Sequence, residues 1–250
     1  MQLENTASSQ LMVHCGGNIV TRDQLFVLDT PAATVTHHPM PHSDLLEMIE
    51  DSVTRKFKVD VDSLDAAYGV SADQQQLFGV IAMKLDSDEH SISYGFRNDH
   101  GKKLSAALTL GARVFVCDNL AFSSSGVNVF RKHTKNVYRD MRFQIEDAVQ
   151  ASTGEYDKIV AGWEKQKTMP LSLDAGFSAI GRAQGHGVLL PNQAAVAFSE
   201  WKQPSHVEFE ERNVYALSQA FTESAKKGSP ALAQTRYPKI SEFFDAEFMH

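Results

Sequence analysis

Residues 91–101 read SISYGFRNDHG, and this stretch indicates a β-strand that ends in a tight turn. Ile92, Tyr94 and Phe96 alternate with smaller or polar residues, which is the period-two pattern of a half-buried strand. Residues 98–101 come directly after it and are rich in turn-forming types. The stretch therefore predicts one strand of an antiparallel sheet together with the turn that leaves it.

Similar strand-like runs lie on both sides of this stretch, at 77–85 and at 104–117. The linkers between the three runs, 86–89 and 98–101, are short, so the simplest pairing is a β-meander in which each strand pairs with the next. An earlier segment, 57–62, alternates strictly between apolar and polar residues and is predicted as a further strand.

The hydrophobic period changes after Asn136. Apolar residues now recur every three or four positions, as on one face of a helix. Gly154 either separates two helices or lies within one long helix. Ser172 is predicted to cap a later helix, and Pro191 stands where the first turn of another would begin. Strands followed by helices favour an α+β fold: an antiparallel meander in the N-terminal half and a mainly helical C-terminal half.

The limits of the strand-rich and helical patterns predict how the chain is organised into an arm, a domain and a tail. The tail is expected to be loop with a short amphipathic piece around Ile240 and Phe243. The expected parts are a flexible N-terminal arm at 1–22, which could also form an edge strand, a single α+β domain at 23–228 (strand-rich over 23–130 and helical over 136–228) and a C-terminal tail at 229–250.

Composition narrows the class of protein. No apolar run approaches the roughly 20 residues that span a bilayer, and residues 1–10 lack the basic and apolar pattern of an export signal. The chain has two cysteines, Cys15 and Cys117, too few for a disulfide framework. We therefore expect a cytoplasmic protein with no membrane partner.

Five separated blocks of the sequence, 36–42, 95–100, 114–122, 131–134 and 200–223, resemble one known family. The chain is similar to the phage/plasmid-like family of unknown function, which includes the YafZ and YfjQ prophage proteins, and the blocks occur in the same order. The resemblance implies association with phages, plasmids and bacterial genomes. It transfers no functional residue, because the family has no motif of settled catalytic role.

Reactive residue types lie at the ends of the two main strands. His100, Cys117, Asp118 and His133 are candidates for a general base, a nucleophile or metal ligands, and would make the protein a metal- or cysteine-dependent hydrolase. Consecutive turns of a meander lie at opposite ends of the sheet, so their convergence depends on the register. The alternative is that 98–101 is merely a turn and Cys117 a small buried residue.

A set of histidines suggests a second kind of site. Imidazole and carboxylate groups suit Zn²⁺ or Mn²⁺, and ligands from separate segments can meet in space. No strong ligand spacing is present, so no metal site is assigned and the cofactor stays open. The set is His37, His38, His42, His133, His206 and Glu208.

A basic segment gives the leading hypothesis. Positive charges beside Tyr138 and Phe143 are what a single-stranded nucleic-acid groove requires, because lysines and arginines neutralise phosphates while aromatic rings stack on bases. The net charge of −7 opposes a broadly basic surface but allows a local groove. The alternative is a solvated start of a helix. The basic residues are Arg131, Lys132, Lys135, Arg139 and Arg142.

Three functions therefore remain open. The first is a mobile-element accessory protein that binds single-stranded DNA, and the second is the hydrolase. The third is an inhibitor that binds a host protein, which the acidic net charge would suit. Self-association into a homo-oligomer is compatible with all three.

Overall fold

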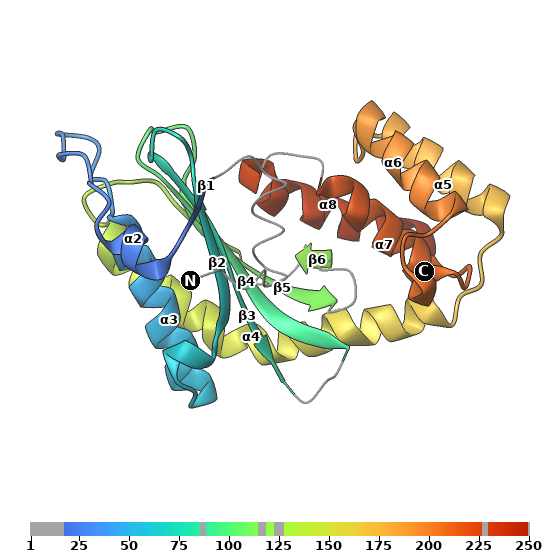
Figure 1. Ribbon diagram of the computed structural model, residues 1–250, viewed down its shortest axis with the longest axis horizontal. Coiled ribbons are helices and arrows are strands. Elements are labelled where there is room, and N and C mark those ends of the chain that lie inside the picture. The colour runs from blue at the N-terminus through green and yellow to red at the C-terminus, as the bar shows by residue number, and fades with distance from the viewer. Residues whose placement is uncertain (1–17, 86–88, 115–118, 123–127, 227–229, 250) are drawn as a thin grey trace.

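The structure, a computed structural model, describes residues 18–85, 89–114, 119–122, 128–226 and 230–249. A sheet dominates its first half and helices its second, so the predicted α+β class is confirmed (Figure 1). The described strands are β1 (Asn18–Val20), β2 (Asp65–Val70), β3 (Gln76–Lys84), β4 (His90–Asp99), β5 (Ala106–Val114), β6 (Asn119–Phe122) and β7 (Asn128–Arg131).

The described helices include two short 3-10 turns. Ser172 and Pro191 stand where the sequence placed them, the first as the N-cap of α5 and the second at the first position of α6. The helices are α2 (Arg22–Phe26), α3 (His42–Phe57), η1 (Val61–Ser63), α4 (Val137–Lys167), α5 (Leu173–Gly185), α6 (Pro191–Lys202), η2 (Val207–Phe209), α7 (Val214–Ala225) and α8 (Pro230–Phe248).

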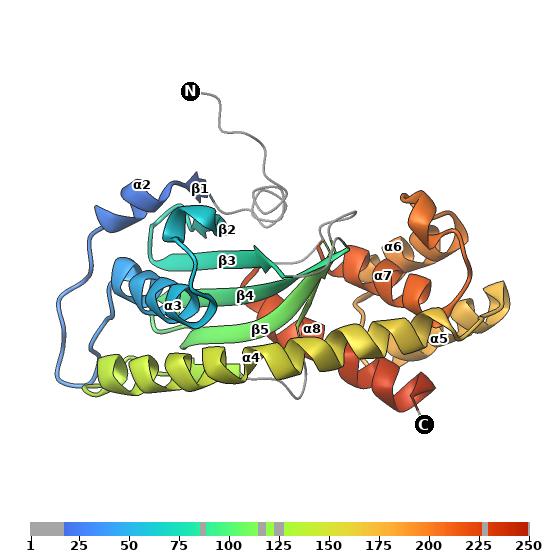
Figure 2. The same cartoon turned by 90° about the horizontal axis from the view of Figure 1, so that it is seen from below.

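The sheet is the predicted antiparallel meander. Among the described residues its strands follow the order β1-β2-β3-β4-β5, and β6 and β7 pair with successive parts of the outer edge of β5. Helices α3 and α4 both lie across one face of this sheet (Figure 2). Ile49 and Val53 of α3 and Met141 and Ile145 of α4 are fully buried there, and their removal from water drives the packing.

Helix α4 runs without a break through Gly154 and belongs to both halves of the molecule. Its first part packs on β5 and β7, and its later part contacts α7. Trp163, near its C-terminal end, meets the ring of Tyr215 on α7 at 6.1 Å. The alternative of two helices separated at Gly154 is therefore wrong.

The register brings three strand ends together. β4 ends at Asp99, β5 begins at Ala106 after one turn, and Arg131 of β7 lies opposite Ala106. We call this edge the Asp99 end. At the other end of the sheet, Val114 of β5 lies opposite His90 of β4. The segments after β4 and after β7 are therefore neighbours.

The strand predicted at 57–62 is wrong. Phe57 completes the last turn of α3, one helical turn after Val53, so its apolar side chain belongs to the helix period. Lys58 then adopts a left-handed conformation with φ of 55°, which ends the helix, and η1 comes next. The alternation of apolar and polar residues at 57–62 therefore comes from the end of a helix and the 3-10 turn that follows it, not from a strand.

The described parts of both chain ends form regular structure. The tail is helix α8 rather than mostly loop, because Phe244 is buried and contacts Phe221 of α7 at 5.0 Å. In the N-terminal arm, Asn18–Val20 pairs with β2 as an edge strand, one of the two forms expected there, and Arg22 begins α2. Within the described residues, no helix combines the length and apolar composition needed to cross a membrane.

An ion pair fastens α2 to the body of the protein. The buried carboxylate of Glu50 on α3 accepts hydrogen bonds from Arg22 Nε at 3.1 Å and Nη2 at 2.9 Å. The hydroxyl of Tyr68 on β2 donates to the same carboxylate at 3.3 Å. Arg22 also stacks over Phe26, 4.4 Å from the ring centre. The guanidinium thus compensates a charge that would otherwise be buried alone.

Candidate functional site

Asp99 shapes the turn after β4. One carboxylate oxygen accepts the N–H of Gly101 at 2.7 Å and the other accepts the N–H of Leu104 at 2.7 Å. The side chain of Gln76 donates to the second oxygen at 3.3 Å. Lys102 takes a left-handed conformation with φ of 65°. The Asp99 carboxylate is therefore occupied in holding the turn. This agrees with the alternative that the polar residues after the strand serve the turn rather than catalysis.

Four histidines gather beside this turn, and we call His37, His42, His100 and His133 the histidine cluster. The rings of His42 and His100 stack with centroids 4.1 Å apart. The ring of His133 meets those of His37 and His100 edge-on, at 5.4 and 6.2 Å. The four residues come from the loop before α3, the start of α3, the turn after β4 and the segment after β7.

The cluster fastens the loop before α3 through the backbone of Met40. The Met40 N–H donates to Nδ1 of His133 at 3.0 Å. The Met40 carbonyl accepts from Nε2 of His100 at 2.7 Å and from the side-chain amide of Asn98 at 2.8 Å. Nε2 of His37 donates to the His100 carbonyl at 3.1 Å. Residues far apart in sequence are thereby joined at the Asp99 end.

These contacts determine which ring nitrogen of each neutral histidine carries the proton. A backbone N–H only donates, so Nδ1 of His133 holds a lone pair and Nε2 holds the proton. A carbonyl only accepts, so His37 and His100 carry theirs on Nε2 and have a lone pair on Nδ1. His42 uses both nitrogens: Nε2 contacts the carbonyl of Gln74 at 3.2 Å and Nδ1 contacts the Asn98 amide at 3.0 Å.

Burial dominates the electrostatics of the cluster. Desolvation lowers the pKa of His42 and of His133 to about 4, and the neighbouring imidazoles add to both shifts. Desolvation also lowers the pKa of His100. Asp99 acts in the opposite direction on all three rings. His42, His100 and His133 are therefore harder to protonate than histidines in water.

The free energy of unfolding is expected to fall as the pH drops from about 6.5 to about 4. In that window an unfolded histidine binds a proton while folded His42 and His133 do not, so protons favour unfolding. Above the window the stabilisation is complete. Each residue contributes roughly 3 kcal/mol of pH dependence, from a shift of about 2.5 pH units. Urea unfolding between pH 7.5 and 4.5 measures the effect.

His42→Asn is expected to weaken this pH dependence, and His186→Gln, at the exposed C-terminus of α5, provides the control. A His42→Asn protein that loses stability with falling pH as steeply as the wild type would show that the cluster is not the cause.

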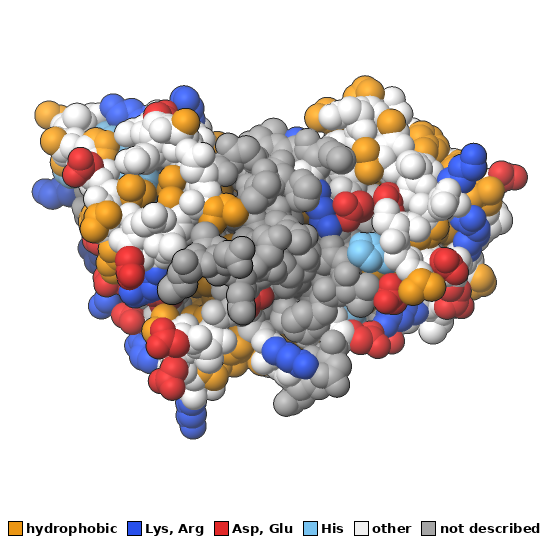
Figure 3. All heavy atoms as spheres, in the orientation of Figure 1, with side chains coloured by type: hydrophobic (Ala, Val, Ile, Leu, Met, Phe, Trp, Pro, Cys, Tyr) orange, Lys and Arg blue, Asp and Glu red, His pale blue; other side chains and the backbone are white. Residues whose placement is uncertain are grey.

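An open cavity of about 390 Å³ adjoins the histidine cluster. The loop before α3, the turn after β4 and the segment after β7 form its walls. Lys, Arg and His side chains show at this corner of the molecule, at the upper left of Figure 3. The lining residues are Thr36, His37, Lys102, Lys103, Leu104, Ser105, Lys132, His133 and Thr134, and none of them is a carboxylate.

The predicted basic segment continues from this cavity onto α4. Tyr138, Arg139, Arg142 and Phe143 are exposed on the first turns of the helix, and we call them, with exposed Lys135, the basic stripe. Phe143 is 62% exposed and Tyr138 39% exposed, so neither belongs to the core. Arg139 is itself paired with Asp140 at 3.2 Å, which reduces its availability to a ligand.

The structure separates the predicted site residues into three groups. His100 and His133 lie together, whereas Cys117 and Asp118 lie outside the described residues. His37 and His42 of the predicted metal set join the same cluster, and His38 takes part only through its backbone N–H, which donates to the His133 carbonyl at 2.9 Å. The remaining two members of that set, His206 and Glu208, lie in the helical half near η2.

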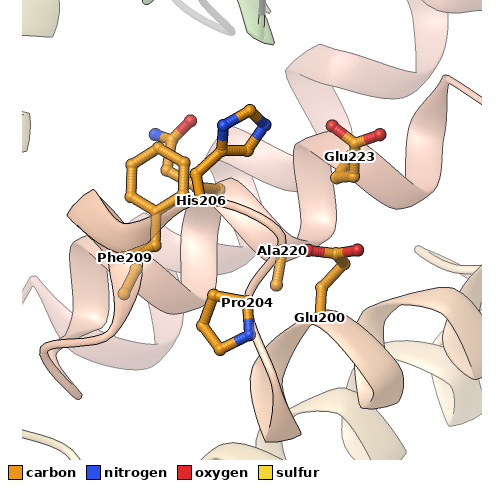
Figure 4. Close-up of a pocket in the computed structure, with 8 residues that line it drawn as sticks. Glu200, Pro204, His206, Phe209, Ala220 and Glu223 are labelled. Carbon is orange, nitrogen blue, oxygen red and sulfur yellow. The ribbon is translucent and has the colours of Figure 1, made fainter. Parts of the chain in front are cut away.

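A small hollow near His206 has little room for a ligand (Figure 4). Its volume is about 10 Å³, which is about the space of one water molecule. Glu200 accepts from the hydroxyl of Ser205 at 2.7 Å, and Glu223 pairs with Lys226 at 2.6 Å. Both carboxylates of the hollow are thus already engaged.

Metal-ligand geometry occurs at one place in the described residues, where Glu89, His90 and Glu164 bring ligand atoms within 4.8 Å of one another. Lys167 already pairs with Glu89 at 3.0 Å and with Glu164 at 2.7 Å. Its ammonium group neutralises the carboxylates that a cation would need. The described ring nitrogens of the histidine cluster do not meet this distance criterion.

Lys102 and Lys103 line the cavity but were not among the predicted site residues. A usable signal was present, because the two lysines come directly after the turn-forming Gly101, and turn residues lie at the surface.

The chain was compared with protein-family models, with curated proteins and with solved structures, and it matches none of them.

Proposed function

We propose that the chain binds single-stranded nucleic acid through the cavity at the Asp99 end and the basic stripe. The observation that carries the proposal is the lining of the cavity, where Lys102, Lys103 and Lys132 stand beside two histidines and no carboxylate. In a chain of net charge −7, this is a local concentration of positive charge. Phosphate groups are the ligands that such a concentration attracts.

The dimensions favour one nucleotide unit in the cavity, since its volume of about 390 Å³ lies at the lower end of small-molecule pockets. A longer strand would continue along the basic stripe. There Phe143 and Tyr138 offer exposed rings for stacking, and Arg142 offers a charge for the backbone. Stacking on aromatic rings needs unpaired bases, so a single strand is favoured over a duplex.

Exposed Phe130 of β7 adds a further ring at the same end of the sheet, with the guanidinium of Arg97 5.7 Å from its centre.

We also propose, from the sequence blocks alone, that the chain belongs to the phage/plasmid-like family and acts in the cytoplasm as a mobile-element accessory protein. Nucleic-acid binding would suit that setting.

The test reverses the charge of the cavity. In the triple variant Lys102→Glu, Lys103→Glu, Lys132→Glu, the affinity for a fluorescent 20-nucleotide single strand is expected to fall at least about tenfold at low salt, because several phosphate contacts are lost. The plot of log affinity against log salt should also become shallower, by roughly 0.7 for each lost contact. Fluorescence anisotropy measures both quantities.

A matched control carries Lys165→Glu, Lys202→Glu and Lys239→Glu, three exposed lysines of the helical half. It has the same net charge as the test variant, so wild-type affinity there would assign the effect to the cavity. Equal losses in both triple variants would attribute binding to overall charge. Absence of binding by the wild-type protein at micromolar concentration would refute the function.

A further inference from the structure

His37 stands on the wall of the basic cavity with one ring nitrogen uncommitted. Nε2 donates to the His100 carbonyl at 3.1 Å, which fixes the ring and leaves the lone pair on Nδ1. Within the described residues, Nδ1 has no hydrogen-bond partner. The backbone is held as well, because Thr34 Oγ1 accepts the His37 N–H at 3.1 Å. A histidine oriented by a carbonyl is the usual arrangement of a general base.

The other cluster histidines cannot take this role. His133 also lines the cavity, but its Nδ1 is engaged by Met40 and its Nε2 carries the proton, so it offers no lone pair. Both nitrogens of His42 are engaged. His100 has a lone pair on Nδ1 but does not line the cavity. Among the described histidines of the cavity, His37 is therefore the one that can accept a proton.

We propose that the cavity cleaves single-stranded RNA by transesterification without a metal ion, with His37 as the general base; the proposal rests on the nucleic-acid binding proposed above. Nδ1 of His37 removes the proton of a ribose 2′-hydroxyl. The 2′-oxygen attacks the adjacent phosphorus, forming the O2′–P bond while the P–O5′ bond breaks. The products are a 2′,3′-cyclic phosphate and a 5′-hydroxyl end.

The lysines provide the remaining parts of the reaction. Negative charge increases on the non-bridging oxygens as the fifth bond to phosphorus forms, and the cationic residues Lys102, Lys103 and Lys132 line the cavity that the phosphate would occupy. The leaving 5′-oxygen takes a proton from a cavity ammonium group, which water then reprotonates. The imidazolium of His37 returns its proton to the solvent, so the protons balance.

The substrate class depends on the source of the nucleophile. The attacking oxygen belongs to the ribose, so the reaction needs RNA and neither an activated water nor a bound cation. DNA, which lacks the 2′-hydroxyl, would occupy the same cavity and remain intact.

The test incubates a fluorescent single-stranded RNA, its DNA counterpart and a fully 2′-O-methylated RNA with the full chain in excess EDTA. Cleavage of the unmodified RNA alone, with 2′,3′-cyclic phosphate ends, is expected. His37→Gln should lower the rate by about 10²–10⁴-fold, the usual contribution of a general base, while RNA affinity changes little. Added imidazole should partly restore cleavage by His37→Gly. His38→Gln, purified in the same way, is the matched control and should cleave at the wild-type rate.

The outcomes separate the two proposals. RNA that is bound but not cleaved would overturn this inference and leave the binding function intact. Cleavage that EDTA abolishes, or that His37→Gln retains in full, would also overturn it. If neither RNA nor DNA binds, the proposed function itself fails.

Discussion

Replacing Gly79 with alanine is expected to lower the free energy of unfolding by about 3 kcal/mol, the upper part of the range for overpacked cores. Gly79 of β3 lies directly opposite Phe96 of β4, and the phenyl ring lies over it. A Cβ at Gly79 would come 2.1 Å from Cζ of that ring, where no pair of carbon atoms can stand. The ring is buried and its centre lies 6.3 Å from that of the Tyr68 ring, so it has little room to move.

Thermal unfolding measures this effect, which corresponds to a drop of roughly 6–12 °C in Tm for a chain of this size. Gly154→Ala in α4 is the control, because nothing lies within 4 Å of its added methyl group and alanine favours a helix. In a Phe96→Leu background, Gly79→Ala should cost clearly less than in the wild type. Additive losses in the double variant would show that the ring is not the obstacle.

Arg22→Ala is expected to destabilise the protein by about 3 kcal/mol, near the lower end for breaking a buried ion pair because the guanidinium is partly exposed. The side chain of Glu50 is only 5% exposed and that of Arg22 is 42% exposed. Removal of the arginine leaves a carboxylate that water cannot reach, whereas removal of the glutamate leaves a cation that water can still solvate. Arg22→Ala should therefore cost more than Glu50→Gln.

Urea unfolding compares these two single variants with the double variant Arg22→Met, Glu50→Leu. The double change removes both charges and keeps the volume apolar, so it should recover most of the loss. Hydrogen exchange should show faster opening at Leu25, the buried residue of α2, in Arg22→Ala. Equal stability of Arg22→Ala and the wild type would mean that the pair contributes nothing.

Local patterns predicted the elements whose residues interact mainly with chain neighbours. Ile92, Tyr94 and Phe96 correctly indicated β4. The strand is buried on both faces rather than half-buried, and Asn98 and Asp99, predicted in the turn, still pair with β3, so the turn begins at His100. The alternation at 57–62 failed because a helix stripe ending at Phe57 and a 3-10 turn can produce the same spacing.

The site could be predicted only in part, because it depends on register. The sequence named His37, His42, His100 and His133 but distributed them between two separate hypotheses. Their meeting requires β7 to pair with β5 so that Arg131 lies opposite the start of β5, a long-range pairing that no short window encodes. Tertiary contacts of this kind also decided α8, whose packing on α7 overrides a weak amphipathic pattern.

The continuity of α4 has a consequence for how the molecule unfolds. A helix of 31 residues is about 46 Å long, and the same rod packs on the sheet with Ile145 and on α7 with Trp163, both within one hydrophobic core. Opening this core at either end would remove packing that keeps the shared helix in place. The two halves are therefore coupled energetically, and loss of structure at one end of the rod lowers the free energy needed to open the other.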